Sequence, residues 1–185
     1  MVNTSKPVVA IFGGSFDPPH KAHQHIVEKA LASLEIDKLI VVPAYLNPFK
    51  TSSLASAQQR LAWCHTLFDE IPNVIVDDYE IKEGKSTRTS QSVKHFNKAY
   101  DVKYLIIGSD NLSTLTKWHA FDWLNEHIQW VVFTREGHEV NTDSLRSWEV
   151  IPLKEMVSSS EVRERQTLKD IDKRIENSVK QILKG

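Results

Sequence analysis

The sequence predicts an α/β fold in which a parallel sheet is covered by helices on both faces. Short β-branched runs alternate with segments whose apolar residues recur at helical spacing, and parallel strands need crossover connections, which are usually helical. A length of 185 residues with 41% hydrophobic and 25% charged residues is ordinary for one domain with a substantial core. No repeat or linker interrupts the sequence, so we expect a single domain over residues 1–185, with a C-terminal helical region from about residue 158.

The first predicted unit is a strand, a glycine loop and a helix. Residues 8–12 form a short β-branched run closed by Gly13-Gly14, which is typical of a strand buried on both faces. Pro19 suits the first helical position because its missing N–H costs nothing there. Helical spacing of apolar residues then follows at Ile26, Val27, Ala30, Leu31 and Leu34.

The same pattern continues along the chain. Residues 38–42 read as a strand, followed by a Pro/Asn loop and a helix over about 56–69. Four more strands and a helix are expected, the strands at 73–76, 104–107, 129–134 and 148–151 and the helix at 90–100. Apolar residues from Ile171 to Leu183 alternate with lysines and acids, which predicts an amphipathic C-terminal helix packed on the body.

Composition limits the classes of partner. The 23 Lys and Arg nearly balance the 24 Asp and Glu, giving a formal net charge of −1, so no global field favours nucleic acid or an anionic membrane. The sequence contains no apolar run near the roughly 20 residues that span a bilayer and no secretory signal pattern. Its single cysteine, Cys64, weakly indicates a reducing compartment. We expect a cytoplasmic protein without nucleic-acid or membrane partners, and homo-oligomerisation stays open.

Two histidines follow the glycine loop between the first strand and the first helix. Parallel sheets bind ligands outside the carboxyl ends of their strands, glycines let the backbone approach a phosphate, and a helix start offers N–H groups and a partial positive charge. His20 and His23 are three residues apart, so both could contact one phosphate. The alternatives are a structural turn with surface histidines, or a metal pair, for which no third ligand is evident.

A second candidate segment lies near the C-terminus. Ser158 and Glu161 have the spacing of a capping box, so one interpretation is simply the start of a helix. Three hydroxyls, from Ser158, Ser159 and Ser160, together with free N–H groups and Arg163 one turn later, also describe a polyphosphate site.

These two segments resemble the signatures of a known superfamily. Residues 13–23, Gly-Gly-Ser-Phe-Asp-Pro-Pro-His-Lys-Ala-His, resemble the G-G-[TS]-F-D-P-x-H-x-G-H motif of the nucleotidyltransferases that include the nicotinate mononucleotide and phosphopantetheine adenylyltransferases. Ala22 stands where that motif has glycine. Residues 157–163 resemble the second motif, I-S-S-T-x-I-R. Two motifs in the right order rarely arise by chance, and the resemblance implies a Rossmann-like nucleotidyltransferase fold.

Three further segments point to one branch of this superfamily. Residues 108–118 resemble the G-x-D-x-L-x-x-L-x-x-W segment of the nicotinate mononucleotide adenylyltransferases. The phosphopantetheine enzymes lack this segment. Asn47-Pro48-Phe49-Lys50 resembles the family's P-P-H-K motif, with phenylalanine replacing histidine. Residues 87–93 are similar to S-Y-T-x-x-T-L, but Arg88 replaces the tyrosine, which leaves the choice between a nicotinate and a nicotinamide acceptor open.

The resemblance implies transfer of AMP from ATP to nicotinate mononucleotide, giving nicotinate adenine dinucleotide and pyrophosphate, with Mg²⁺ as cofactor and no metal site of the protein's own. The alternatives are an enzyme acting on nicotinamide mononucleotide or phosphopantetheine and a non-catalytic nucleotide-binding regulator. The implied catalytic residues are His20, His23, Lys50 and Arg163. The implied ATP site adds Gly13, Gly14, Ser15, Phe16, Gly108, Asp110, Ser158, Ser159 and Ser160, and the implied acceptor site consists of Asp17, Lys50, Thr89, Trp118 and Arg135.

Overall fold

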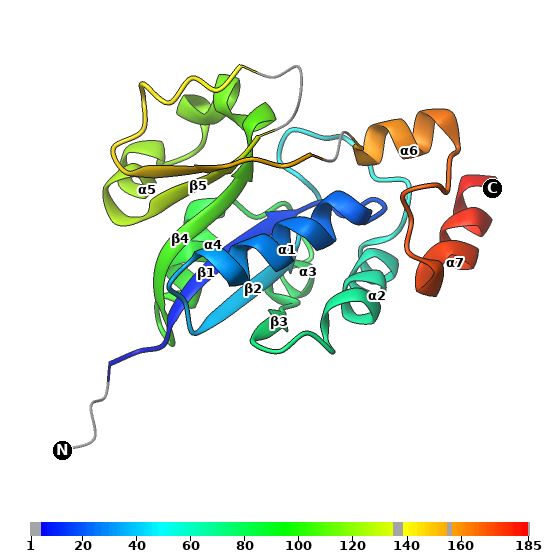
Figure 1. Ribbon diagram of the computed structural model, residues 1–185, viewed down its shortest axis with the longest axis horizontal. Coiled ribbons are helices and arrows are strands. Elements are labelled where there is room, and N and C mark those ends of the chain that lie inside the picture. Colours follow the sequence, from blue (N-terminus) through cyan, green and yellow to red (C-terminus); the bar gives the residue numbers. More distant parts are fainter. Residues whose placement is uncertain (1–4, 135–138, 155–156, 185) are drawn as a thin grey trace.

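A computed structural model describes residues 5–134, 139–154 and 157–184 of the chain. Within these residues six strands form one sheet in the order β3-β2-β1-β4-β5-β6, and every neighbouring pair is parallel. The strands are β1 (Val8–Gly14), β2 (Lys38–Pro43), β3 (Val74–Val76), β4 (Asp101–Gly108), β5 (Gln129–Phe133) and β6 (Trp148–Ile151). The predicted parallel α/β fold is therefore confirmed (Figure 1).

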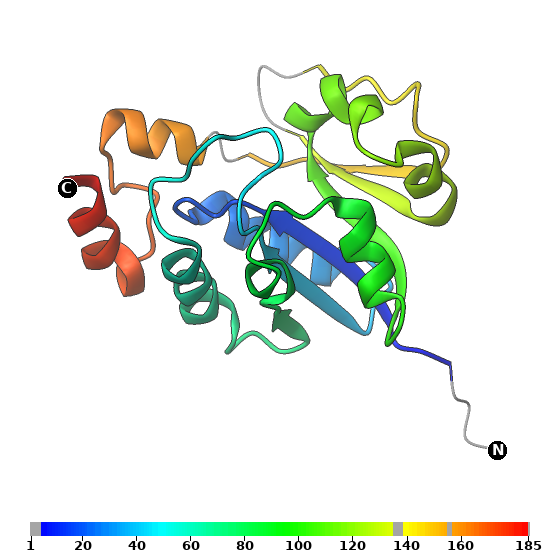
Figure 2. The same cartoon turned by 180° about the vertical axis from the view of Figure 1, so that it is seen from behind.

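Helices cover both faces of this sheet, as Figures 1 and 2 show from opposite sides. They are α1 (Lys21–Ser33), α2 (Ala57–Phe68), α3 (Tyr79–Lys82), α4 (Thr89–Phe96), the 3₁₀ helix η1 (Ser109–Lys117), α5 (Phe121–His127), α6 (Ser159–Arg165) and α7 (Lys173–Lys184). No helix among the described residues has the length and apolar character needed to cross a bilayer.

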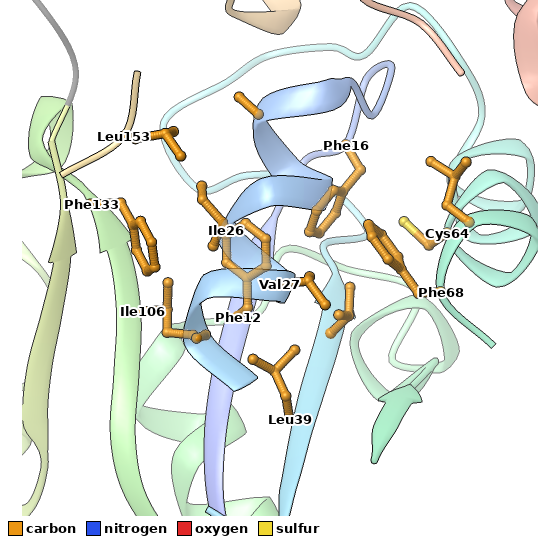
Figure 3. Packing of buried hydrophobic residues seen from close by; sticks show 14 of the residues in the cluster. Phe12, Phe16, Ile26, Val27, Leu39, Cys64, Phe68, Ile106, Phe133 and Leu153 are labelled. Carbon is orange, nitrogen blue, oxygen red and sulfur yellow. The ribbon is translucent and has the colours of Figure 1, made fainter. Parts of the chain in front are cut away.

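Alternating side chains of each strand build two separate cores. Ala10 and Phe12 of β1 face α1, α2, α6 and α7, whereas Val9 and Ile11 face α4, η1 and α5. In the first core, Phe12 and Ile106 of the sheet pack with helix residues such as Ile26 (Figure 3). Because successive side chains of a strand point to opposite faces, a strand covered on both sides must be apolar throughout, which is the pattern seen in the sequence.

Several element boundaries differ from those expected. Helix α1 begins at Lys21 with His20 as its N-cap, so Pro19 precedes the cap and is not the first helical residue. Helix α4 ends at Phe96, earlier than predicted, because the Asn97 side chain accepts a hydrogen bond from the Val102 N–H (3.0 Å) and turns the chain into β4. The short helices α3 and α5 were not predicted, since helices of this length depend on tertiary contacts for their stability.

Candidate active site

The site lies where the strand order reverses. Strands β1 and β4 are neighbours at the centre of the sheet, with β2 following on one side and β5 on the other. In open parallel sheets, ligands bind beside the carboxyl ends of the strands at this switch point. Gly14 at the end of β1 and Gly108 at the end of β4 therefore lie at the same edge, as expected from the sequence.

The segment from Gly13 to His20, here called the glycine loop, is held by its own aromatic residue. Phe16 is 1% exposed and adopts a left-handed backbone with φ 48°, and its ring packs on Phe12 with centroids 5.4 Å apart. A Cβ on Gly14 would meet that ring at 3.2 Å, so a larger residue there would force the Phe16 ring to shift. Phe16 can then offer a ligand only its main chain, because its side chain is buried in the core.

The two histidines stack against each other at the start of α1. Their ring centroids are 3.8 Å apart, His20 is 1% exposed, and the main-chain N–H of His20 donates to Nδ1 of His23 (3.1 Å). A ring nitrogen that accepts a hydrogen bond carries no proton. The neutral His23 ring therefore carries its proton on Nε2, and this is the atom through which it can donate to a ligand.

Helix α6 contacts the glycine loop directly. The Ser159 hydroxyl donates to the Pro18 carbonyl (2.9 Å), and Nη1 of Arg163 donates to the Asp17 carbonyl. Nη2 of Arg163 also donates to the Ser160 hydroxyl (3.1 Å). The two segments identified in the sequence, far apart along the chain, thus form one surface.

The cap of α6 has the predicted geometry. The Glu161 N–H donates to the Ser158 hydroxyl (3.1 Å), and the Ser158 N–H donates to the Glu161 carboxylate (3.0 Å). The capping-box interpretation is therefore correct as local structure. It coexists with the contacts to the glycine loop, so the capped helix start and a phosphate-binding role do not exclude each other.

Asp17 anchors a neighbouring loop. The residue is 3% exposed, and its two carboxylate oxygens accept hydrogen bonds from the main-chain N–H groups of Leu54 (2.8 Å) and Ala55 (2.9 Å). These residues end the segment 44–55 between β2 and α2, here called the Lys50 loop. Nη1 of Arg163 lies 3.8 Å from the same carboxylate. Asp17 thus joins the glycine loop, the Lys50 loop and α6.

Lys50 shares the electrostatic environment of this cluster. Desolvation and then the positive charge of Arg163 lower the pKa of Lys50, while Asp17 acts in the opposite direction. Lys50 is exposed at the surface, so its ammonium group is available to an anion. A phosphate bound between Lys50 and Arg163 would relieve the repulsion between two like charges.

Arg60 is a site residue that the sequence analysis missed. It lies in the first turn of α2, is 1% exposed, and donates hydrogen bonds to main-chain carbonyls of both loops. A signal for it was present in the sequence. Arg60 precedes Cys64 and Leu67 by four and seven residues, so a charged side chain falls on the buried face of an amphipathic helix.

Two of the predicted acceptor residues, Trp118 and Thr89, lie on the side of the sheet that α4 and η1 cover. Trp118 follows η1, is partly buried and packs edge-on against Trp130 with centroids 6.3 Å apart. Thr89 is the first residue of α4, and the next residue, Ser90, places its hydroxyl 3.2 Å from Nδ1 of His119. The start of α4 is therefore tied to the segment that carries Trp118.

Two further predicted site residues are Asp110 and Arg135. Asp110 lies in the first turn of η1, two residues after Gly108. The predicted acceptor residue Arg135 lies outside the described residues. Indole Nε1 of Trp118 is buried and has no hydrogen-bond partner among the residues that the structure describes, which leaves a donor next to the predicted acceptor position.

Fold and site together define a nucleotidyltransferase of the cytidylyltransferase-like class, and the family model of that description, Cytidylyltransferase-like, matches residues 11–165. A protein of Sulfurovum sp. (strain NBC37-1), described as a probable nicotinate-nucleotide adenylyltransferase, is 64% identical over 184 residues, covering 100% of this chain and 98% of that protein. A protein of a Nitratiruptor species with the same description is 46% identical over 157 residues, covering 84% of this chain and 86% of that protein. The chain belongs to the nicotinate-nucleotide adenylyltransferase family.

Solved structures share the fold. The Plasmodium falciparum nicotinic acid mononucleotide adenylyltransferase complexed with NaAD aligns with a TM-score of 0.74 and 19% identity, covering 95% of this chain and 94% of that one. The same enzyme complexed with APC aligns with a TM-score of 0.73 and 20% identity, over 96% and 94% of the two chains. At this level of identity the likeness concerns the architecture.

Proposed function

We propose that the chain transfers the adenylyl group of ATP to nicotinate mononucleotide, forming nicotinate adenine dinucleotide and pyrophosphate. One observation carries this assignment: α6 and the glycine loop, the two segments suited to a triphosphate, are hydrogen-bonded to each other through Ser159 and Arg163. Relatives with the same described activity cover nearly the whole chain.

The reaction needs no protein nucleophile. An oxygen of the acceptor's 5′-phosphate forms a bond to the α-phosphorus of ATP, the bond from that phosphorus to the bridging oxygen breaks, and pyrophosphate leaves with the electron pair. Catalysis then rests on positioning and on neutralising charge at the transferring group. His23 is suited to donate to an α-phosphate oxygen from Nε2, because its Nδ1 is occupied by the His20 N–H.

The β- and γ-phosphates are assigned to the cationic side of the site. Arg163 and Lys50 supply positive charge there, and the start of α6 adds the partial positive charge of a helix N-terminus. Helix α6 has seven residues, so its dipole is a small contribution and the arginine provides most of the attraction.

Mg²⁺ enters as the magnesium complex of ATP. Among the described residues, no group of three His, Cys, Asp or Glu side chains could hold a metal ion, and both carboxylate oxygens of Asp17 already accept main-chain hydrogen bonds. Mg²⁺ commonly keeps several waters and is bound mainly through substrate phosphates. This arrangement fits a metal that neutralises phosphate charge while the protein holds the phosphates.

The acceptor is assigned to the region of Trp118 and Thr89. A pyridine ring can stack on an indole, and the start of α4, with Arg88 exposed beside it, is electropositive. Positive potential favours the carboxylate of nicotinate over the neutral amide of nicotinamide. The proposed substrates also favour a cytoplasmic location.

An acceptor panel tests the proposal. The purified protein is incubated with ATP, Mg²⁺ and, separately, nicotinate mononucleotide, nicotinamide mononucleotide or phosphopantetheine, and pyrophosphate and the dinucleotide are measured. Nicotinate mononucleotide should give the highest kcat/KM. A higher value with another acceptor would reassign the substrate, and ATP binding without pyrophosphate release from any acceptor would point to a nucleotide-binding regulator.

A further inference from the structure

Arg60 is a buried cation whose hydrogen bonds all go to main-chain carbonyls. Its side chain is 1% exposed. Burial lowers the pKa of the guanidinium, and the nearby Asp17 carboxylate partly opposes that shift. A buried charge is costly unless every donor is satisfied. The carbonyl groups that accept from the guanidinium therefore indicate the role of Arg60.

The guanidinium joins both loops of the site. Nη1 donates to the carbonyls of Ser15 (2.7 Å) and Ala44 (2.6 Å). Nη2 donates to Tyr45 (2.6 Å), and Nε to Ala55 (3.3 Å). Ser15 belongs to the glycine loop, whereas the other three carbonyls belong to the two ends of the Lys50 loop.

This pattern closes the Lys50 loop at its base. Residues 44, 45 and 55 are fixed to one planar group, while Asp17 accepts from the N–H groups at positions 54 and 55. The same guanidinium is bonded to the glycine loop. Figure 2 shows the segment between β2 and α2 arching out from the sheet, so the position of its middle depends on how its two ends are held.

Only arginine fits this role. Its five donors are arranged in a rigid planar fork, whereas lysine offers three donors from a single point. A lysine at position 60 would keep the charge but could not reach carbonyls on three separate segments at once. The substitution therefore separates the geometry of the group from its charge.

We propose that Arg60 is a positioning residue for adenylyl transfer, which sets the placement of Lys50 relative to the glycine loop without contacting substrate. The proposal rests on the function proposed above, in which Lys50 binds phosphate. Arg60 itself is enclosed by protein, so it acts only through the loops that it holds.

The first test measures the loop without any substrate. Trypsin cleaves after lysine, and mass spectrometry reports the rate at the Lys50–Thr51 bond in the parent protein, in Arg60→Lys and in Leu67→Ala. Leu67 is a buried residue of the same helix, and its apolar side chain donates no hydrogen bond, so its truncation costs stability without removing a hydrogen bond to either loop. We expect Arg60→Lys to accelerate this cleavage by about tenfold or more and Leu67→Ala to leave it within about twofold. Equal rates in Arg60→Lys and the parent would overturn the proposal.

The second test is a double-mutant cycle on turnover, run well below the melting temperature of every variant. Arg60→Lys should lower kcat by roughly 10- to 100-fold, the scale expected for misplaced catalytic groups. In a Lys50→Ala background the same change should cost less than about threefold, because the group being positioned is already absent. If Arg60→Lys lowers kcat by the same factor in both backgrounds, Arg60 acts through general stability and the proposal is wrong.

These tests separate failure of this inference from failure of the proposed function. If the parent protein forms no dinucleotide with any acceptor, the function is wrong, and the trypsin measurement alone still decides whether Arg60 holds the Lys50 loop. If the parent is active and the cleavage rate is unchanged in Arg60→Lys, the function stands and the positioning role falls.

Discussion

Glu80 makes the stability of the protein depend on pH near neutrality. It lies in α3, is 8% exposed, and its carboxylate accepts a hydrogen bond from the Ser92 hydroxyl of α4 (2.6 Å). Burial raises the pKa of Glu80 to about 7, and the Ser92 hydrogen bond only partly opposes this. The folded protein therefore binds this proton more tightly than the unfolded chain does.

The sign and size of the effect follow from linkage. Where the folded state binds more protons than the unfolded state, the free energy of unfolding falls as pH rises. For Glu80 this interval runs from about pH 4.5, the ordinary value for the group, to about pH 7. Each pKa unit is worth about 1.4 kcal/mol, so the full difference is about 3 kcal/mol. We expect Glu80→Gln, which keeps the shape and remains neutral, to remove this dependence.

The assay is urea unfolding at pH 5 and pH 8 of the parent protein, Glu80→Gln and Glu83→Gln. Glu83 is exposed and directly follows α3, so it serves as the matched control. Relative to the parent, the free energy of unfolding of Glu80→Gln should rise by about 2–3 kcal/mol on going from pH 5 to pH 8. Glu83→Gln should show no such gain over the parent. A gain below about 0.5 kcal/mol, within the range of ordinary surface substitutions, would refute the assignment of a buried, proton-binding carboxyl.

Three further substitutions test the site. His23→Ala should lower kcat by on the order of 10²-fold in a pyrophosphate-release assay, and a variant with near-normal turnover would remove this histidine from the mechanism. Asp17→Asn leaves a main-chain N–H of Leu54 or Ala55 without its acceptor, so urea unfolding should show a loss of about 2–4 kcal/mol; a loss under about 1 kcal/mol would show that the loop is held otherwise. Ala22→Gly should cost about 1–2 kcal/mol through helix propensity and the lost buried methyl group, and an unchanged melting temperature would contradict the complete burial of that residue.

The strands could be located from sequence because each contains a short, largely apolar run. All six lie where β-branched runs predicted them, with ends shifted by a few residues, and the burial of β1 on both faces explains why no polar alternation appears in it. The short helix α5 could not be found in this way. It is held by contacts from elsewhere, such as the Asn125 side chain, which accepts from the Trp130 indole (3.0 Å) and the Arg146 N–H (2.9 Å).

Only part of the candidate site could be predicted from the sequence. The spacing of motif residues indicated His20, His23 and Arg163, and the structure brings the histidine loop and the arginine helix into contact. The structural role of Asp17 could not be predicted, because a carboxylate beside a phosphate motif looks like a ligand-binding group. In the structure its oxygens accept main-chain hydrogen bonds. Ala22, which replaces the glycine of the family motif, is fully buried in the core cluster with Phe12.

The contact between α6 and the glycine loop has a consequence for biosynthesis. Ser159 and Pro18 are 141 positions apart, so the contact between α6 and the glycine loop cannot form until the ribosome has synthesised residue 159. Helix α7 packs on α2, where the Trp63 indole donates to the Ser178 hydroxyl (3.0 Å). A nascent chain that ends before α6 would lack the hydrogen bonds from Ser159 and Arg163 to the glycine loop, so the proposed triphosphate site would be incomplete.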